Sequence, residues 1–454
     1  MSGATARDVD TLVDGQQFRG FNLALLIWSF LATLSDGFEL SALGFAVPHI
    51  SEEWHVAPAD MGWMLSASLF GMFFGAPLFG AIGDRYGRRP AIVIGCLAFG
   101  ITTLAIAGAH SIGQITVLRF IAGLGMGGLL PNTIALSSEL SPRRLRARLV
   151  ILMFMGITLG SSLPGLIAAW VVPAHGWQAI FVIGGVGATL IGILLAFALP
   201  ESVKLLAMRE GRREELLRTL RRMRPDVALG DDVTLTLVTA RPHQASARAL
   251  FAGGLAPFTL LIWVCFATTL MANFFLANWL PQLFKQMGVS AEDAALTATM
   301  YHFGATLGGL AMSLILDRIG FLAIGSLLLV AVPAMVGIGA PGLSPVMLGL
   351  LVAFAGFCVL GAQFGSNAAA GLIYPTGCRS RGLGLAFGIG RVGSVLGPLL
   401  GAHLIGSSLP VTTMLAAMAA PVLLGALAAL VLAVLSRRKI ASWGLDEVPP
   451  NPIE

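Results

Sequence analysis

The sequence predicts an all-α membrane protein with twelve transmembrane helices, arranged as two pseudo-symmetric bundles of six. Composition is the first reason: 56% of the 454 residues are hydrophobic and 11% are charged, whereas soluble domains carry about 25% charged residues. The mean hydropathy of +0.85 agrees with this. Apolar windows of about twenty residues, the length that crosses a bilayer as a helix, recur along the chain. The two halves of the chain also match each other at a constant offset.

The apolar windows form two groups of six. In the first half they fall at 21–47, 61–82, 90–109, 114–139, 148–172 and 178–200. In the second half they fall at 257–284, 294–316, 320–340, 345–369, 381–405 and 411–435. The pattern predicts an N-terminal bundle over residues 1–200 and a C-terminal bundle over 257–454 that ends in a short cytoplasmic tail.

A charged segment, 201–256, separates the two groups and contains no window that could span a membrane. Its apolar residues recur at helical spacing among arginines; they are Leu205, Leu206, Leu216, Leu217, Leu220 and Met223. This pattern predicts an amphipathic cytoplasmic linker suited to lie along the membrane face. Because such a linker explains the basic residues, we expect no nucleic-acid partner.

The distribution of basic residues orients the chain. With both termini in the cytoplasm, only Lys285 of the 28 Lys and Arg residues falls in an external loop. Arg119 and Arg391 fall inside spans, and the others lie on the cytoplasmic side. Since cytoplasmic loops carry the excess of Lys and Arg, we expect a multi-pass protein with two cytoplasmic termini.

The halves align at an offset of 233 residues, which indicates an internal duplication. The matched positions are Pro48 with Pro281, Asp84-Arg85 with Asp317-Arg318, Gly87 with Gly320, Pro142 with Pro375, Arg146 with Arg379 and Gly160 with Gly393. Parallel repeats of this kind in transporters place the substrate site near the midplane between the halves, which rock to give alternating access.

Two carboxylates, Asp36 and Glu39, lie inside the first apolar window. Charge at that depth costs at least about 2.5 kcal/mol per residue, so its presence requires a reason. The i, i+3 spacing places both acids on one face of a helix, where they can face the same cavity. Proton relays are a common use of such residues, so we predict that one or both acids carry a coupling proton. A static ion pair with Arg119 is the alternative.

The motif GAIGDRYGRR, at residues 80–89, lies in the short loop after the second span, and LDRIG repeats part of it at 316–320. It resembles the loop signature of the major facilitator superfamily, as do ELSPRRLR at 139–146 and YPTGCR at 374–379. The resemblance implies a charge network that closes the cytoplasmic side as the halves rock. Its members would be Asp84, Arg85, Arg88, Arg89, Glu139, Arg146, Asp317 and Arg318. Simple positive-inside anchoring is the alternative.

Three further segments resemble the aromatic acid:proton symporters within this superfamily. They are DGFE at 36–39, RFIAGLGMGG at 119–128 followed by Pro131-Asn132, and GIGRVG at 388–393 followed by Gly397-Pro398. That family often has Asp at the position of Glu39. The resemblance implies a proton-coupled importer of a small aromatic carboxylate, of the benzoate, hydroxybenzoate or protocatechuate type, in the inner membrane of a cell. We expect it to work as a monomer, without a cofactor.

Arg391 is the main candidate for binding the substrate, together with Arg119. A guanidinium offers a planar, bidentate partner to a carboxylate, and Gly388, Gly390 and Gly393 are expected to leave space for a ligand beside Arg391. A locking salt bridge from Arg391 to Asp36 or Glu39 is the alternative, and the two uses can alternate within one cycle.

Other candidates for the substrate site are polar or aromatic residues within the spans. They are the amides Asn273, Asn278, Gln363 and Asn367, the rings of Phe38 and Tyr301, and His302. Amides can hydrogen-bond ring hydroxyls or merely join helices. A packing role is the alternative for the aromatic residues and for His302.

Several other classes of function are disfavoured. The run Gly156, Gly160, Pro164-Gly165 only partly matches the motif of drug:proton antiporters, so we interpret it as tight packing, and efflux of drugs or organic acids is the alternative to import. A sensor without transport is a weaker alternative, since no output domain is attached. Cys96, Cys265, Cys358 and Cys378 lack metal-ligand spacing, and no Walker-type phosphate loop occurs. We expect neither an enzyme nor a metalloprotein.

Overall fold

The computed structural model describes residues 7–209, 211–227, 229–230, 233, 235–236, 247–252, 254–374, 379–407 and 409–442. Within these residues twelve helices are long and apolar enough to cross a membrane, which confirms the predicted fold class. In the first half they are α2 (Gly20–Glu53), α3 (Gly62–Tyr86), α4 (Arg88–Ile106), α5 (Ile112–Leu140), α6 (Arg143–Trp170) and α8 (Gln178–Ala198). In the second half they are α11 (Ala256–Gln286), α12 (Ala291–Ile319), α13 (Phe321–Ile338), α14 (Pro345–Ile373), α15 (Arg379–Gly406) and α16 (Val411–Ser442).

Short elements complete the described chain. They are β1 (Arg7–Asp8), α1 (Val9–Asp14), η1 (Pro58–Met61), α7 (Val172–His175), α9 (Val203–Ala207), α10 (Arg213–Met223), β2 (Leu235–Thr236) and η2 (Ala247–Leu250). The strands β1 and β2 form a two-residue parallel pair, in which Arg7 lies opposite Leu235.

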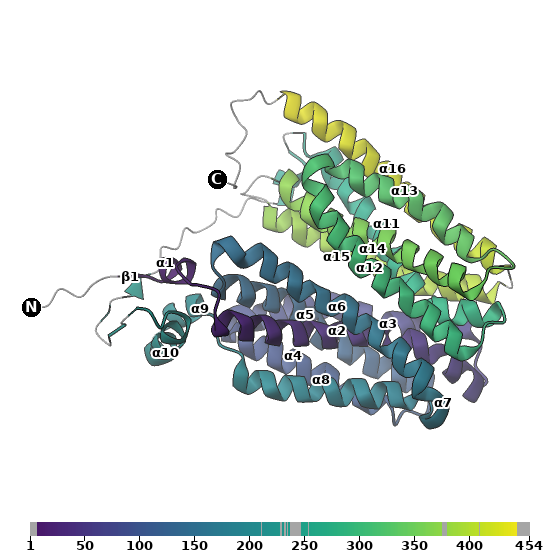
Figure 1. Cartoon of the computed structure of the whole chain (residues 1–454), viewed down its shortest axis with the longest axis horizontal. Coiled ribbons are helices and arrows are strands. Elements are labelled where there is room, and N and C mark those ends of the chain that lie inside the picture. Colours follow the sequence, from purple (N-terminus) through teal and green to yellow (C-terminus); the bar gives the residue numbers. More distant parts are fainter. Residues whose placement is uncertain are drawn as a thin grey trace, which may run out of the picture. The chain divides into compact units, whose positions relative to one another are not determined.

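The helices group by their contacts into two compact units. The first unit comprises Met1–Val56 and Trp63–Arg241, and the second comprises Ala57–Gly62 and Pro242–Glu454. In the first unit α2 packs against α6, and α4 packs against both α5 and α8 (Figure 1). In the second unit α11 packs against α15, α12 against α14, and α13 against α16.

Close helix contacts at glycines repeat in both units at the offset of 233 residues. At each of these glycines an added Cβ atom would overlap the backbone of the neighbouring helix, so only glycine permits the approach. The contacts Gly160–Leu34, Gly71–Phe120, Gly75–Leu124 and Gly123–Ser68 of the first unit correspond to Gly393–Ala267, Gly304–Ala353, Gly308–Phe357 and Gly356–Tyr301 of the second. Both partners of every contact shift by 233, which supports the duplication. The contact of Gly160 also confirms that this part of the fifth span packs tightly.

The buried charges do not repeat. The positions 233 residues after Asp36, Glu39 and Arg119 hold Thr269, Ala272 and Val352. The packing of a six-helix unit therefore does not require these charges, since the second unit is built on the same glycine contacts without them.

Two differences from the predicted boundaries affect how the motifs are interpreted. The first span does not end at Val47: α2 continues through Pro48 to Glu53, because a membrane helix tolerates the single backbone hydrogen bond lost at proline. The motif at residues 80–89 is not a loop either. Helix α3 runs to Tyr86 and α4 begins at Arg88, with only Gly87 between them at a φ of 129°, a value that favours glycine.

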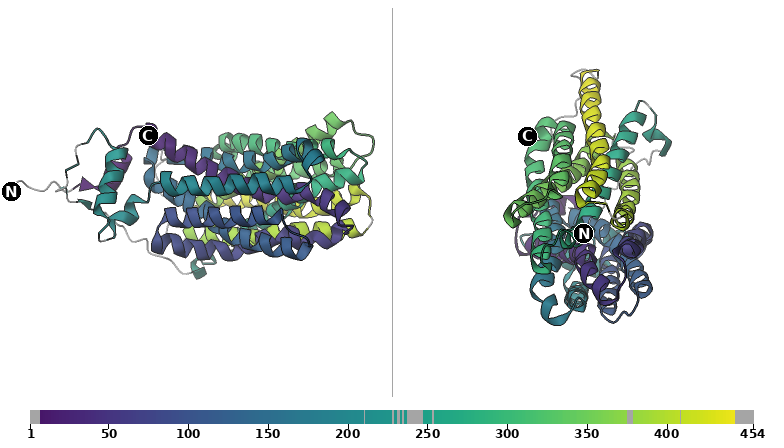
Figure 2. Two further views of the ribbon diagram at one scale, coloured as in Figure 1. Left: turned by 90° about the horizontal axis from the view of Figure 1, so that it is seen from below. Right: turned by 90° about the vertical axis from the view of Figure 1, so that its right-hand side faces the viewer.

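The helices α1, α9 and α10 lie together beyond one end of the membrane helices of the first unit (Figures 1 and 2). The predicted amphipathic pattern is confirmed, because all six apolar residues named for the linker are buried by protein. That the linker lies along the membrane face stays a prediction. The segment before α2 also docks here, where the amide of Gln16 donates to the carbonyl of Leu140 at 3.1 Å and Lys204 pairs with Asp10 at 2.9 Å.

The contact of Gly160 gives a stability prediction. The variant Gly160→Leu should lower the free energy of unfolding by about 1–3 kcal/mol, the usual cost of overpacking, because its side chain meets the backbone at Leu34. The matched control is Gly187→Leu in α8, where an added Cβ meets no described atom within 4 Å. Thermal unfolding of both variants in detergent measures the difference. Equal unfolding temperatures would contradict the close packing of α2 and α6.

Candidate functional site

The first unit holds a buried ion pair inside its membrane helices. Glu39 of α2 pairs with Arg119 of α5, and each is 1% exposed. Arg119 Nη1 also donates to the backbone carbonyl of Glu39 at 2.9 Å, and its Nη2 donates to Ser68 Oγ of α3 at 2.8 Å. Thr103 Oγ1 of α4 donates to the second oxygen of the Glu39 carboxylate at 2.7 Å. Four helices therefore meet at this one pair of charges.

Asp36 lies one helical turn before Glu39 and is also 1% exposed. The backbone around it is fixed by the close contact of α2 with α6. An added Cβ at Gly37 would overlap the backbone at Ile157. Ser161 Oγ of α6 donates to the carbonyl of Gly37 at 2.9 Å, and Ser41 Oγ donates back to the carbonyl of Ser161 at 2.8 Å. These contacts hold the backbone of α2 beside Asp36 against α6.

Phe38 lies on the same stretch of α2 but packs away from these charges. Its ring occupies the space that a side chain at Gly184 of α8 would fill. In this structure it is a packing residue of the first unit, the alternative reading given for the aromatic candidates.

Arg88 is the centre of a charge network in the first unit, at the end where α3 ends and α4 begins. It pairs with Asp84 at 2.7 Å, and its Nε lies 4.0 Å from a Glu139 oxygen. Its Nη1 also donates to Asn132 Oδ1 at 3.5 Å. Asp84 is 72% exposed, so the ion pair of Asp84 with Arg88 is weak in itself. The structure thus brings together Asp84, Arg88 and Glu139 of the predicted gate.

Glu201 belongs to this network and was missed by the sequence analysis. Its carboxylate accepts from the backbone N–H of Arg88 at 2.9 Å and of Ser202 at 2.8 Å, and so caps the N-terminus of α4. Ser202 in turn donates to the carboxylate of Glu139. Burial raises the pKa of the Glu201 carboxyl, and the hydrogen bonds from Ser202, Arg89 and Arg88 oppose that rise. The only signal in the sequence is an acid that follows Pro200, directly after an apolar window.

Three other predicted gate arginines point elsewhere. Arg89 donates to the carbonyl of Ala196 at the end of α8, Arg146 donates to the carbonyl of Ser141 at 3.5 Å, and the guanidinium of Arg85 lies 5.4 Å from the ring centre of Tyr86. In the second unit Arg318 is exposed at the end of α12. The side chain of Asp317 and residues Pro375 and Cys378 lie outside the described residues.

A buried polar cluster in the second unit joins α11 and α12. Tyr301 is fully buried, and its hydroxyl donates to Asn273 Oδ1 at 3.0 Å. The ring of His302 meets that of Tyr301 edge to face, with 5.4 Å between the ring centres. Three of the predicted site residues are therefore brought together.

The other predicted amides include oxygens with unused hydrogen-bonding capacity. Gln363 Nε2 donates to Asn367 Oδ1 one turn further along α14 at 2.9 Å, and Asn278 Nδ2 donates to the carbonyl of Phe274 at 2.8 Å. Among the described residues, the side-chain oxygens of Gln363, Asn278 and Gln282 are buried and accept no hydrogen bond. A buried acceptor of this kind is costly, so each is suited to accept from a water or a ligand hydroxyl. Gln282 was missed by the sequence analysis.

Arg391 is half-buried in α15, and the expectation about its glycines is largely wrong. Gly393 lies against the backbone of Ala267, and a side chain at Gly390 would meet Leu270, so both glycines serve the packing of α15 on α11. Only at Gly388 would an added Cβ meet no described atom within 4 Å. Gly388 and Arg391 are three residues apart and share one helix face.

Comparison with known proteins identifies the family. The family model of the Major Facilitator Superfamily matches residues 29–398 and 262–452. A 4-hydroxybenzoate transporter, PcaK, of Pseudomonas putida is 34% identical, with 94% of this chain and 96% of the relative covered. A gallate transporter of Pseudomonas putida is 32% identical, with 93% and 94% covered. The benzoate transport protein of Acinetobacter baylyi is 31% identical, with 92% and 91% covered.

Solved structures agree on the fold. A D-xylose-proton symporter matches with a TM-score of 0.67 at 19% identity, covering 90% of this chain and 97% of that one. An inward-facing bacterial homologue of the human lysosomal transporter Spinster matches with a TM-score of 0.66 at 17% identity, covering 96% and 100%. The chain therefore belongs to the major facilitator superfamily, and within it to the family of aromatic acid transporters, and it is a transporter rather than an enzyme.

Proposed function

We propose that this protein is a proton-coupled symporter that imports a small aromatic carboxylate of the benzoate, hydroxybenzoate or protocatechuate type by alternating access. The observation that carries the proposal is a buried carboxylate, Asp36, one turn from the ion-paired Glu39 inside a membrane helix. Such residues are expensive in a bilayer and serve proton pathways in carriers. The relatives named for 4-hydroxybenzoate, gallate and benzoate support the substrate class.

Glu39 and Asp36 have different roles in this proposal. Protonating Glu39 would leave the charge of Arg119 buried without its partner, which is strongly unfavourable. The pair is therefore a fixed support that joins helices of the first unit. Asp36, held by the contact of α2 with α6, is the group that takes up and releases the coupling proton.

The aromatic acid is bound by side chains of the second unit. Arg391 binds the carboxylate, because a guanidinium matches it in charge and in planar geometry. Ring hydroxyls donate to the buried amide oxygens of Gln363 and Asn278, which have capacity to accept. Benzoate lacks these hydroxyls, so hydroxylated acids should bind more tightly.

Transport in vesicles tests the function. Purified protein in liposomes with an inward proton gradient should accumulate labelled 4-hydroxybenzoate, and a protonophore should abolish the accumulation. With one proton per substrate, a gradient of one pH unit supports about tenfold accumulation, since it corresponds to about 1.36 kcal/mol. The variant Asp36→Asn should lose accumulation but keep exchange of internal for external substrate, because binding remains while the proton carrier is gone.

Three other results would contradict the proposal. Substrate driven outward by the same gradient would indicate efflux, and binding without movement would indicate a sensor. Wild-type accumulation by correctly inserted Asp36→Asn protein would remove Asp36 from coupling.

The buried pair gives a second prediction. Glu39→Gln should lower the free energy of unfolding by about 3–5 kcal/mol, because the charge of Arg119 stays buried without its partner. The double variant Glu39→Gln/Arg119→Gln removes both charges and should recover most of the lost stability. Unfolding temperatures in detergent are measured for wild type, for Glu39→Gln, for Arg119→Gln and for the double variant, which together form a double-mutant cycle. If the double variant is as unstable as the sum of the single variants, the two residues do not act as a pair.

The proposed carboxylate contact gives a third prediction. Arg391→Lys keeps the charge but loses the planar fork, and should weaken binding of 4-hydroxybenzoate by about 1–3 kcal/mol. Binding of the neutral 4-hydroxybenzamide should change little. The control is Arg381→Lys at the exposed start of the same helix. Calorimetry on the purified proteins measures each affinity, and equal losses for acid and amide would assign Arg391 to the fold or the gate.

A further inference from the structure

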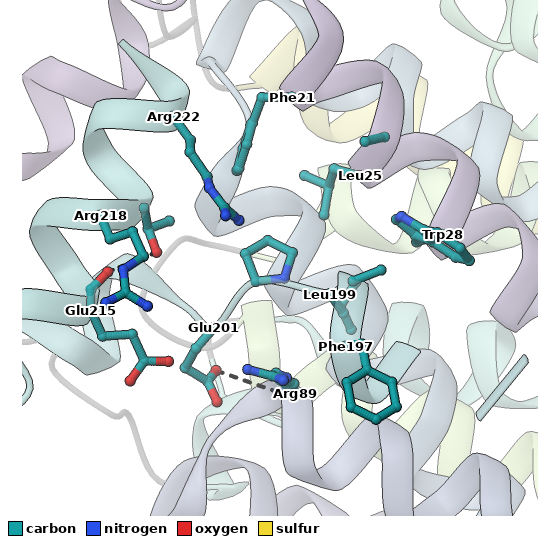
Figure 3. A pocket seen from close by; sticks show the side chains of 14 residues that line it. Phe21, Leu25, Trp28, Arg89, Phe197, Leu199, Glu201, Glu215, Arg218 and Arg222 are labelled. Atoms are coloured by element: carbon teal, nitrogen blue, oxygen red, sulfur yellow. Dashed lines mark hydrogen bonds between the residues drawn. The ribbon is translucent and has the colours of Figure 1, made fainter. Parts of the chain in front are cut away.

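A pocket of about 520 Å³ lies in the first unit, at the end where α2 begins and α8 ends. Its walls come from the first turns of α2, the start of α4, the end of α8 with the residues that follow it, and α10 (Figure 3). These are the ends of three membrane helices and one helix outside the membrane. The pocket therefore opens at the level where a membrane helix passes from hydrocarbon to water.

One side of the pocket is basic. Arg89, Arg218 and Arg222 line it. Arg89 donates to the carbonyl of Ala196, and Arg218 forms an exposed ion pair with Glu214 at 3.0 Å. Arg222 reaches into the pocket from α10 (Figure 3) and makes no hydrogen bond or ion pair with any other described residue. At least one guanidinium is thus available to an anion.

The two acids of the pocket do not neutralise this guanidinium. Glu201 accepts from the backbone N–H groups of Arg88 and Ser202 at the start of α4. Glu215 pairs with Arg212, which precedes α10, at 2.6 Å. Since both carboxylates are already engaged, the charge that the pocket offers to a ligand is positive.

Apolar and aromatic side chains also line the pocket. Phe21 and Trp28 come from α2, and Phe197 comes from the last turn of α8 (Figure 3). Phe197 is 83% exposed on a helix that spans the membrane. Aromatic rings of this kind lie at the membrane interface, where the headgroups meet the acyl chains.

We propose that this pocket binds an anionic phospholipid, with its phosphate on Arg222 and its first acyl carbons along Phe197 and Trp28. A guanidinium binds phosphate through two parallel hydrogen bonds, and basic pockets between membrane helices on the cytoplasmic side recruit anionic headgroups. A soluble anion would contact the arginines and leave the aromatic rings uncovered. A zwitterionic lipid would bring a cation of its own next to three arginines.

Fluorescence quenching tests the site. The protein in detergent is titrated with phosphatidylglycerol brominated in its acyl chains, and the signal of Trp28 is the difference between wild type and Trp28→Phe. Phosphatidylglycerol should quench Trp28 at lower concentration than brominated phosphatidylcholine. Arg222→Gln should raise the half-quenching concentration about tenfold, the loss expected for a charge-assisted hydrogen bond. Phe197→Ala should raise it as well, without a change in charge.

Arg148→Gln is the matched control, because it removes one exposed arginine at the start of α6, outside the pocket. It should leave the titration unchanged. An equal effect of Arg148→Gln and Arg222→Gln would overturn the site in favour of general surface charge. Full competition by glycerol phosphate, with no effect of Phe197→Ala, would show a site for free anions and would also overturn the lipid assignment.

Discussion

The buried ion pair of Glu39 with Arg119 constrains how four helices of the first unit meet one another. It places two charges among apolar helices, where each would be intolerable alone, and Ser68 and Thr103 add hydrogen bonds to the guanidinium and to the carboxylate. Because α2, α3, α4 and α5 all contribute, a shift of any of them at this depth breaks the ion pair or one of its hydrogen bonds. In the proposed mechanism this frame stays in place while Asp36, one turn away, takes up and releases its proton.

The duplicated packing explains why this charge pattern points to function. The close approaches of Gly160 to Leu34 and of Gly393 to Ala267 show that both units are built on the same helix contacts. The second unit keeps those contacts with Thr269 and Ala272 where the first has the two acids. A stable bundle therefore does not need the two acids, which supports the proposed coupling role of Asp36.

Much of the fold and part of the site could be predicted from sequence. Hydropathy finds the twelve spans because a bilayer demands long apolar helices. The ion pair with Arg119 was named from the sequence only as the alternative to proton coupling, and the structure shows it at Glu39. Glu201 was not predicted, because hydropathy shows where a membrane span ends but not which backbone groups the next residue binds. The glycines beside Arg391 were misread, since a missing side chain leaves equal room for a ligand and for another helix, and only the structure shows that α11 fills that room at Gly393.

The central claim is that substrate and proton move together, with the proton carried by Asp36, and it can be tested without an imposed proton gradient. Liposomes containing the protein are given 4-hydroxybenzoate outside, and a pH dye follows the external medium, with empty liposomes correcting for diffusion of the free acid. Symport predicts a transient rise in external pH that is absent with Asp36→Asn. Entry of substrate with no pH change, or with acidification of the medium, would contradict it.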